Sequence, residues 1–348
     1  MKKIVKQVVG IDVAQKELVV CLGKMYDDWK PELYASKTFA NTPKGFISFA
    51  QWVKKLTDSA MPVRFVMEAT GVYHESLAYY LDDHQLEVSI ILPNKISNYA
   101  RSLDVKTVTD KTASEAICMF GLERNTEKWK RPNAVFKKLR QLSRERGQFI
   151  QIRTMSKNQL HAEQSEAEPN SSSIARTKKL IGFLNKQELE VKNEMGQLSK
   201  KDNTVNATIK LICSVPGIGL ITAVSILAET NGFEMIRNKR QLTSYAGLDV
   251  KEKQSGTSVK RKSKISKQGN KHLRKSMHLP ALTAIRHDQR FKAVFVRLVS
   301  KHGIKMKAVV AVQRKLLEMT YTVFKTNKPY EKDYLTKQIG EPEIMEAK

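Results

Sequence analysis

Cysteine is scarce in this sequence of 348 residues. The three cysteines, Cys21, Cys118 and Cys213, lie far apart and are odd in number. This pattern fits a reducing compartment, and it argues against a disulfide framework and against a zinc site. We therefore expect a cytoplasmic protein.

Long hydrophobic runs are also missing. No stretch approaches the roughly 18 apolar residues of a membrane-spanning helix, and the N-terminal Met1-Lys2-Lys3 leads into a strand-like segment without a signal-peptide core. Hydrophobic residues nevertheless make up 41% of the chain. That content and the length of the chain predict two or three folded domains with their own cores, without a signal peptide or a membrane span.

Acidic residues are few relative to basic ones. The chain holds 61 Lys and Arg against 35 Asp and Glu, a formal net charge of +26. Such an excess destabilises the folded state by self-repulsion, and a polyanion that releases its counterions offsets this cost. The charge favours a nucleic acid as the partner. An anionic membrane surface and a merely basic protein are the alternatives.

Strands and helices alternate in the first 125 residues. The patterns predict strands at 4–12, 17–22, 32–39, 62–68 and 86–92, with helices at 43–56 and 73–82. Three meandering strands followed by helix, strand, helix and strand are typical of an α/β layer fold with a mixed sheet. A ribonuclease-H-like fold has this order, so we predict such a domain over residues 1–125.

Helical patterns dominate the rest of the chain. Helices are expected at 111–124, 133–161, 174–201 and 220–229 and near 270–285 and 303–325, with a Ser-rich linker at 169–173. The two long charged helices each carry an apolar stripe, which predicts a helical, coiled-coil-like middle over residues 130–205. A mainly helical domain is expected over residues 206–330, with a tail at 331–348.

Two acidic residues end neighbouring predicted strands. Asp12 follows an apolar run, and Glu68 ends another. Carboxylates at adjacent strand ends repel each other unless a divalent cation lies between them, and oxygen ligands suit Mg²⁺. Asp110 opens a predicted helix and completes the core of this set. The alternatives are a turn residue at Asp12, a helix-capping acid at Glu68 and an N-cap at Asp110.

A strongly basic loop spans residues 251–275, with ten Lys or Arg and one acid. Cations, small hydroxyls and glycines together are typical of a loop that follows a phosphate backbone. Ser255 precedes Gly256, and its cationic surroundings would stabilise an alkoxide. The residues alone do not distinguish Ser255 from Ser258, Ser263 or Ser266, each of which is otherwise an ordinary phosphate contact. The candidate nucleic-acid-binding residues here are Lys260, Arg261, Lys262, Lys264, Lys267, Lys271 and Arg274.

A Pro-Gly-Ile-Gly turn lies between two predicted helices at residues 214–219. It resembles a helix-hairpin-helix, whose backbone N–H groups bind DNA phosphates without sequence preference. Gly217 and Gly219 are therefore further candidates for nucleic-acid binding.

An ordered set of motifs resembles the insertion-sequence one-ten family of transposases, which includes the Piv/MooV-type DNA invertases. The resemblance covers nearly the whole chain. The matching segments are 10–14 (GIDVA), 39–45 (FANTPKG), 67–73 (MEATGVY), 93–94 (PN), 109–111 (TDK), 215–219 (VPGIG), 245–248 (YAGL), 255–256 (SG) and 265–270 (ISKQGN).

This resemblance implies a RuvC-like domain with a DEDD carboxylate set, a coiled-coil middle and a C-terminal domain with a catalytic serine. Asp12, Glu68 and Asp110 match three of the acids, and Ser255 matches the serine. The family's activity would be excision and insertion of its own element by serine attack on DNA with Mg²⁺, guided by a bridge RNA. The resemblance also implies a nucleoid-associated bacterial protein that forms a dimer or tetramer with a composite site.

One position departs from the family pattern. The fourth acid is expected three residues after Asp110, where this chain has Ala113. Glu115 is the nearest substitute, but five helical residues rotate it by about 140° from Asp110. Asp104 is another candidate, and an inactive or differently metallated site is a third possibility. Two alternatives to a recombinase follow, namely a RuvC-like nuclease that uses metal-activated water and a decayed, non-catalytic nucleic-acid-binding protein.

Overall fold

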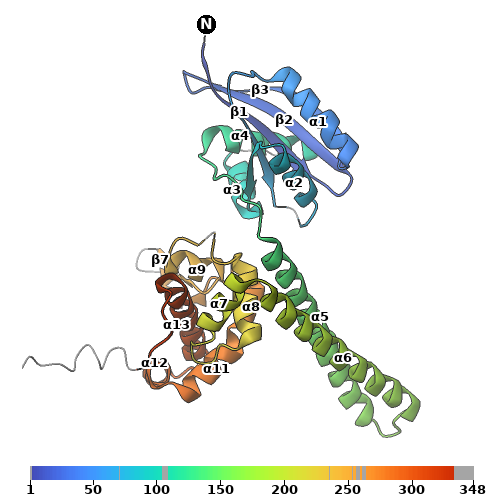
Figure 1. Cartoon of the computed structure of the whole chain (residues 1–348), viewed down its shortest axis with the longest axis vertical. Helices are drawn as coiled ribbons and strands as arrows, with labels where there is room; N and C mark the ends of the chain where they lie inside the picture. Colours follow the sequence, from blue (N-terminus) through green and yellow to red (C-terminus); the bar gives the residue numbers. More distant parts are fainter. Residues whose placement is uncertain are drawn as a thin grey trace, which may run out of the picture. The chain divides into compact units, whose positions relative to one another are not determined.

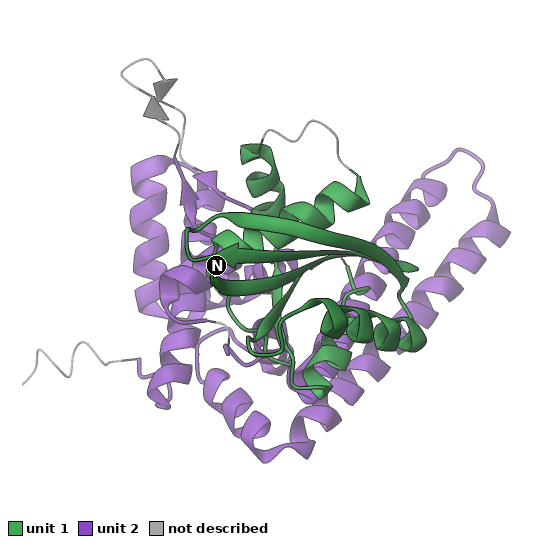
Figure 2. Cartoon of the chain, turned by 90° about the horizontal axis from the view of Figure 1, so that it is seen from above, with its two compact units in different colours: residues 1–131 green, residues 132–348 purple. Residues whose placement is uncertain are grey.

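The computed structural model describes residues 2–69, 71–103, 109–234, 236–252 and 264–332, and the backbone of residues 254–255 and 259–260. The chain forms two compact units, residues 1–131 and residues 132–348 (Figure 2). None of the helices in this described part is long and apolar enough to cross a membrane.

A five-stranded mixed sheet forms the centre of the first unit (Figure 1). Its strands are β1 (Ile4–Val13), β2 (Glu17–Tyr26), β3 (Pro31–Ala40), β4 (Val63–Glu68) and β5 (Glu87–Ile91). Their spatial order is β3-β2-β1-β4-β5. Strand β2 is antiparallel to β1 and β3, whereas β4 is parallel to both β1 and β5. The predicted RuvC- and ribonuclease-H-like strand order is thereby confirmed.

Helices cover both faces of this sheet. Helices α1 (Pro43–Leu56) and α2 (Glu75–Asp83) pack on the face of Val9 and Ile11, and α3 (Pro93–Ser102) and α4 (Asp110–Glu123) on the face of Val8. Strand β1 is buried on both faces, which explains its nearly continuous apolar sequence. Helix α3 was not predicted. Its Pro93, which ends the strand pattern, is also a favoured first residue of a helix.

The second unit is mainly helical. Helices α5 (Ala134–Gln164) and α6 (Ser171–Lys201) form a long antiparallel hairpin (Figure 1). Leu139 of α5 and Met195 of α6 reach the core formed by the remaining helices. Those helices are α7 (Asn203–Ile212), α8 (Leu220–Thr230), α9 (Lys239–Tyr245), α10 (Lys271–Ser276), α11 (His278–His287), α12 (Gln289–His302) and α13 (Lys305–Thr326).

Two expectations about this unit are wrong. The Ser-rich segment is not an open linker, because the Asn170 side chain accepts hydrogen bonds from the Ser172 and Ser173 amides and α6 begins at Ser171. The helix expected near 270–285 is divided at Met277, and a further helix, α12, begins after Asp288. Asn170 and Asp288 are N-caps, which begin new helices by satisfying otherwise unpaired amides.

Candidate functional site

Asp12 and Glu68 occupy matching positions on neighbouring parallel strands. Ile11 is opposite Met67 in the register, so the next residues, Asp12 and Glu68, are neighbours at the carboxyl ends of β1 and β4. Side chains at matching positions point to the same face of a sheet. Asp12 and Glu68 lie on the same face of the sheet as Val8, and α4 covers this face.

Gly10 allows α4 to lie directly on β1. A Cβ atom at Gly10 would lie 2.3 Å from the backbone nitrogen of Cys118 and 2.5 Å from the carbonyl oxygen of Ser114. The Cys118 thiol also donates to the Val8 carbonyl oxygen, at 3.5 Å. Four helical residues and two strand residues both advance the chain by about 6–7 Å. Successive turns of α4 therefore lie above alternate residues of β1.

One further turn of the same helix brings Asp110 to Asp12. The electrostatics agree, because burial and the charge of Asp110 raise the pKa of Asp12, and burial and the charge of Asp12 raise the pKa of Glu68. The Thr109 hydroxyl accepts a hydrogen bond from the Thr112 amide at 3.2 Å and caps α4. Asp110 is therefore the first residue inside the helix, and Glu68 and Asp110 each lie within electrostatic reach of Asp12.

The alternative readings of these acids are wrong. Asp12 lies inside β1 and not in a turn. Helix α2 begins at Glu75 after His74, so Glu68 does not cap it. The cap of α4 is Thr109, so Asp110 is not an N-cap.

The donor set around Asp12 suits a hard divalent cation. It consists of carboxylate oxygens, the ligands that Mg²⁺ prefers, and their mutual repulsion favours a cation between them. Within the described ranges, no group of three His, Cys, Asp or Glu side chains is close enough to hold an ion as it stands. Binding of an ion would therefore need side-chain movements that bring Glu68 and Asp110 closer to Asp12.

Glu115 lies toward another part of the sheet. Its charge acts on the thiols of Cys21 and Cys118. Cys21 belongs to β2 and pairs with Gly10, on the opposite side of β1 from the strand of Glu68. Asp104, the other candidate for a fourth ligand, is outside the described residues.

Asn41 joins the segment that follows β1 to the turn that precedes α2. Its side-chain amide donates to the carbonyl oxygen of Ala14, just after β1, at 2.9 Å and to that of Tyr73, in the loop after β4, at 3.3 Å. We did not predict this role for Asn41. A side chain that bonds backbone atoms 27 and 32 residues away has no local signature in the sequence.

Ser255 belongs to a hairpin within the basic loop. Strand β6 (Val250–Lys251) pairs with β9 (Lys264–Ile265), and β7 (Gln254–Ser255) pairs with β8 (Val259–Lys260). Ser255 is opposite Val259 and is the last residue of β7. Arg261, Lys262, Ser258 and Ser263 lie outside the described residues, and for Ser255 and Lys260 only the backbone is described.

Ser266 closes the base of this loop. Its backbone N–H donates to the Asp249 carbonyl oxygen at 2.8 Å, and its hydroxyl donates to the Asp249 carboxylate at 2.5 Å. Ser266 is therefore engaged in holding the loop ends together. This contact weakens its candidacy as the nucleophile relative to Ser255.

Two of the sequence motifs interlock next to the contact between Ser266 and Asp249. Gly269 has φ +142°, and a Cβ there would lie 2.4 Å from the Tyr245 carbonyl oxygen. The Asn270 N–H donates to the same oxygen at 2.7 Å. Arg274, which we expected to bind nucleic acid, donates to the Ala246 carbonyl oxygen at 2.8 Å. These contacts fix the chain on either side of the β6–β9 pair, and α10 begins at Lys271, so the loop is shorter than the 251–275 expected.

The other predicted nucleic-acid contacts differ in their surroundings. Lys264, Lys267 and Lys271 are exposed. Gly217 has φ +82° and packs on α11, where a Cβ would lie 2.3 Å from the Pro280 carbonyl oxygen. Gly219 is exposed at the start of α8, with open space around it and no side-chain cap. Of the two glycines, Gly219 is the one beside amides that a phosphate could reach.

Known protein families match both units of the chain. Residues 9–164 match a family named DEDD_Tnp_IS110 and described as "Transposase", and residues 209–295 match the "Transposase IS116/IS110/IS902 family". The chain belongs to the IS116/IS110/IS902 family of transposases. Enzymes of this family cleave and rejoin DNA strands, and a DEDD-type carboxylate domain implies use of a divalent metal ion.

Two individual proteins similar to this transposase match nearly its whole length, and others match part of it. It is 28% identical over 329 residues to the pilin gene-inverting protein of Moraxella lacunata, covering 94% of this chain and 98% of that protein, and the same values hold for the Moraxella bovis protein. An uncharacterized 43.6 kDa protein of insertion element IS110 from Streptomyces coelicolor is 25% identical over 121 residues, 35% of this chain and 30% of that protein. Thermus thermophilus RuvC bound to a Holliday junction substrate is 10% identical, with 35% of this chain and 99% of that chain covered and a TM-score of 0.27.

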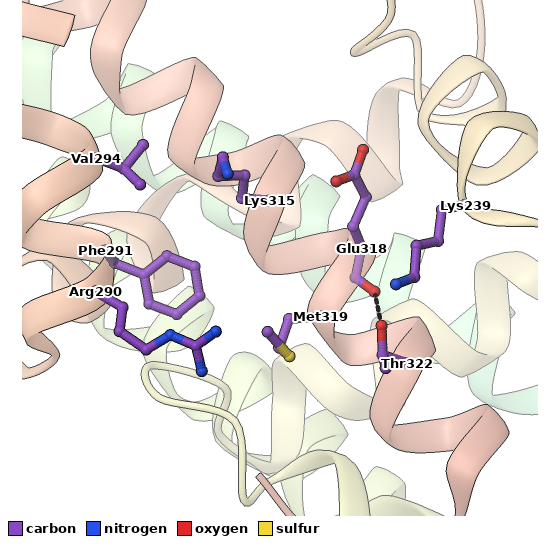
Figure 3. A pocket seen from close by; sticks show the side chains of 8 residues that line it. All are labelled: Lys239, Arg290, Phe291, Val294, Lys315, Glu318, Met319 and Thr322. Carbon is purple, nitrogen blue, oxygen red and sulfur yellow. Dashed lines mark hydrogen bonds between the residues drawn. The ribbon is translucent and has the colours of Figure 1, made fainter. Parts of the chain in front are cut away.

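The transposase also has a basic-rimmed cavity of about 180 Å³ in its second unit (Figure 3). Phe291, Val294 and Met319 supply its apolar lining. Glu318 on the rim is paired with Arg314 at 3.0 Å, so the remaining charges around the cavity are positive. The rim cations are Lys239, Arg290 and Lys315.

Proposed function

We propose that this transposase cuts DNA by attack of the Ser255 hydroxyl on a backbone phosphorus, with Mg²⁺ held by Asp12, Glu68 and Asp110. The placement of Glu68 and Asp110 within electrostatic reach of Asp12 carries the proposal. The position of Ser255 at the end of β7, in a loop with a firmly bonded base and exposed lysines, supports the choice of nucleophile. The position of the family's fourth acid is occupied by Ala113 in this chain, and Glu115 is the nearest acid along α4.

The proposed step balances as a transesterification. The Ser255 oxygen forms a bond to phosphorus and releases its proton, while the bond from phosphorus to a deoxyribose oxygen breaks and that oxygen takes up a proton. Exposed Lys264 and Lys267 attract the phosphate. Bound Mg²⁺ would supply charge stabilisation to the phosphate oxygens. Attack of another deoxyribose hydroxyl on the serine ester would rejoin the strand and restore Ser255.

We also propose that a structured guide RNA, the bridge RNA, is a partner in addition to DNA. The net charge of +26 exceeds what the loop alone contributes, and it suits a second polyanion. The DNA that flanks the gene tests this proposal. A non-coding stretch able to fold and to pair with the junctions of the element is expected, and a flank without one would count against it.

A homo-oligomer is supported by an apolar face on the α5–α6 hairpin, formed by Ile152, Met155, Leu180 and Phe183. Met155 precedes the buried Ser156, and Phe183 precedes the buried Leu184. In an α-helix, each residue is rotated by about 100° from the next one. Because the two helices are antiparallel, the residues that precede the two buried ones therefore point to the same side of the hairpin. Contact between two copies would cover this apolar face.

Single substitutions separate serine attack from hydrolysis by water. We expect Ser255→Ala to abolish strand cleavage on a plasmid that carries the element and to leave DNA binding within about two-fold, a change under 0.5 kcal/mol. The exposed Ser300→Ala is the matched control and should cleave normally. Asp12→Ala should also lose cleavage.

The other functions predict different results from the same variants. Normal cleavage by Ser255→Ala combined with loss in Asp12→Ala would establish a metal-dependent nuclease that uses water. A wild-type chain that binds DNA, but shows no carboxylate-dependent Mg²⁺ binding and no cleavage, would establish a decayed binding protein.

A further inference from the structure

Glu229 is a buried carboxylate between the helical hairpin and the base of the Ser255 loop. It lies on α8, and its side chain is 1% exposed. Arg144 of α5 donates to both of its oxygens, at 2.9 Å each, and the Asn270 side chain donates to Oε2 at 2.7 Å. Burial opposes the charge of Glu229, but the hydrogen bonds from Arg144 and Asn270 hold its pKa below the ordinary value.

Asn270 connects Glu229 to the chain at the base of the loop. Its side-chain oxygen accepts hydrogen bonds from the His272 and Leu273 amides and so caps α10. Its backbone N–H donates to the Tyr245 carbonyl oxygen at 2.7 Å. The Tyr245 hydroxyl in turn donates to the backbone oxygen of Glu229 at 2.8 Å. The residues on both sides of the loop therefore converge on Glu229.

We infer that Glu229 is a positioning residue for Ser255, through which α5 holds the base of the loop. The inference rests on the proposed role of Ser255 as the nucleophile. Separation of Glu229 from Arg144 would leave a buried charge without its partner, which is costly, so α5 and the loop base move together. A displacement of about 1 Å at a reacting group can slow a reaction by about 100-fold. Loss of the Glu229 contacts is therefore expected to disturb the base of the Ser255 loop.

Glu188 provides a matched control for Glu229. It is also a buried carboxylate, 6% exposed, and it is paired with Arg146 and Lys192 at 2.9 Å each and with Arg153. All of these partners lie on α5 or α6, within the hairpin. Loss of the Glu188 charge should therefore weaken the fold in the same manner without reaching the loop.

The test compares Glu229→Gln with Glu188→Gln in the full-length chain. Hydrogen exchange is measured at residues 245–252 and 264–270, and strand cleavage is measured at saturating DNA. We expect Glu229→Gln to speed exchange at both segments and to slow cleavage by about 10- to 100-fold, with the Kd for DNA within about two-fold. Glu188→Gln should lower the Tm similarly and change neither quantity.

Tyr245→Phe is the milder second variant, because it removes one hydroxyl and keeps the ring. It should show the same two effects at smaller size without a large loss of Tm. If Glu229→Gln and Tyr245→Phe behave like Glu188→Gln in exchange and cleavage, Glu229 has no positioning role. Full cleavage by Ser255→Ala would instead refute the nucleophile, and the exchange data would still report whether Glu229 holds the loop.

Discussion

Asp12 is the residue on which the proposed metal site depends. It neighbours Glu68 across the β1–β4 pair and lies within the electrostatic reach of Asp110. Its raised pKa means that the ionised carboxylate opposes folding at neutral pH. This cost is present above the raised pKa, and it disappears as the pH falls through that pKa toward the ordinary value near 3.8. A bound cation would reverse it.

Asp12→Asn should therefore stabilise the protein when metal is absent. We expect the free energy of unfolding in EDTA at pH 7 to rise by on the order of 1 kcal/mol, because the substitution removes a repelled charge. Millimolar Mg²⁺ should stabilise the wild type and not the variant. The exposed Asp27→Asn is the control and should stay within about 0.5 kcal/mol. A loss of stability for Asp12→Asn in EDTA would contradict the repulsive site.

Helix α4 is the element that completes the carboxylate site. Its backbone lies against Gly10, and that contact sets the distance between the sheet and the helix end that carries Asp110. The hairpin helices differ, because Gly147 and Gly182 have nothing within 4 Å of a Cβ position. Glycine is therefore needed at position 10 and can be replaced at positions 147 and 182.

Gly10→Ala should displace α4 and so separate Asp110 from Asp12. We expect a loss of about 1–3 kcal/mol of stability from overpacking, measured by denaturant unfolding, together with weaker Mg²⁺ stabilisation. Gly147→Ala, inside a helix with open space around it, should instead gain about 0.5–1 kcal/mol. Equal Mg²⁺ responses in Gly10→Ala and the wild type would show that α4 does not set the site.

The elements of the carboxylate domain could largely be predicted from the sequence, because period-two strands and amphipathic helices are local patterns. Asp12 and Glu68 were correctly assigned to strand ends for the same reason. The roles of Asn41 and Glu229 could not be predicted, because they come from bonds between segments far apart in the chain. Arg274 and Gly217 were interpreted as contacts for nucleic acid, and the structure shows bonding and packing within the protein at both.

At the scale of the whole molecule, association of copies is expected through the apolar face of the hairpin. Phe183 and Leu189 are equally exposed, at 57% each. Leu189 follows the buried Glu188, whereas Phe183 precedes the buried Leu184. The Leu189 side chain is therefore rotated by about 100° in the opposite sense and points to the other side of the hairpin. The two residues therefore test one side of the hairpin against the other.

Met155→Glu combined with Phe183→Glu should dissociate the oligomer by placing charges in an apolar contact. Sedimentation velocity is expected to show monomers for this variant at concentrations where the wild type associates. Leu189→Glu should associate like the wild type. Association that survives the double substitution would locate the contact elsewhere on the molecule.

The central claim, attack by Ser255, is tested most directly by trapping the protein–DNA adduct. The wild-type chain is incubated with DNA that carries the element ends and a nick that prevents rejoining, then digested and analysed by mass spectrometry. We predict a nucleotide linked to the peptide that contains Ser255, and no adduct in Ser255→Ala. Cleaved DNA without any adduct, or with an adduct on another residue, would contradict the account.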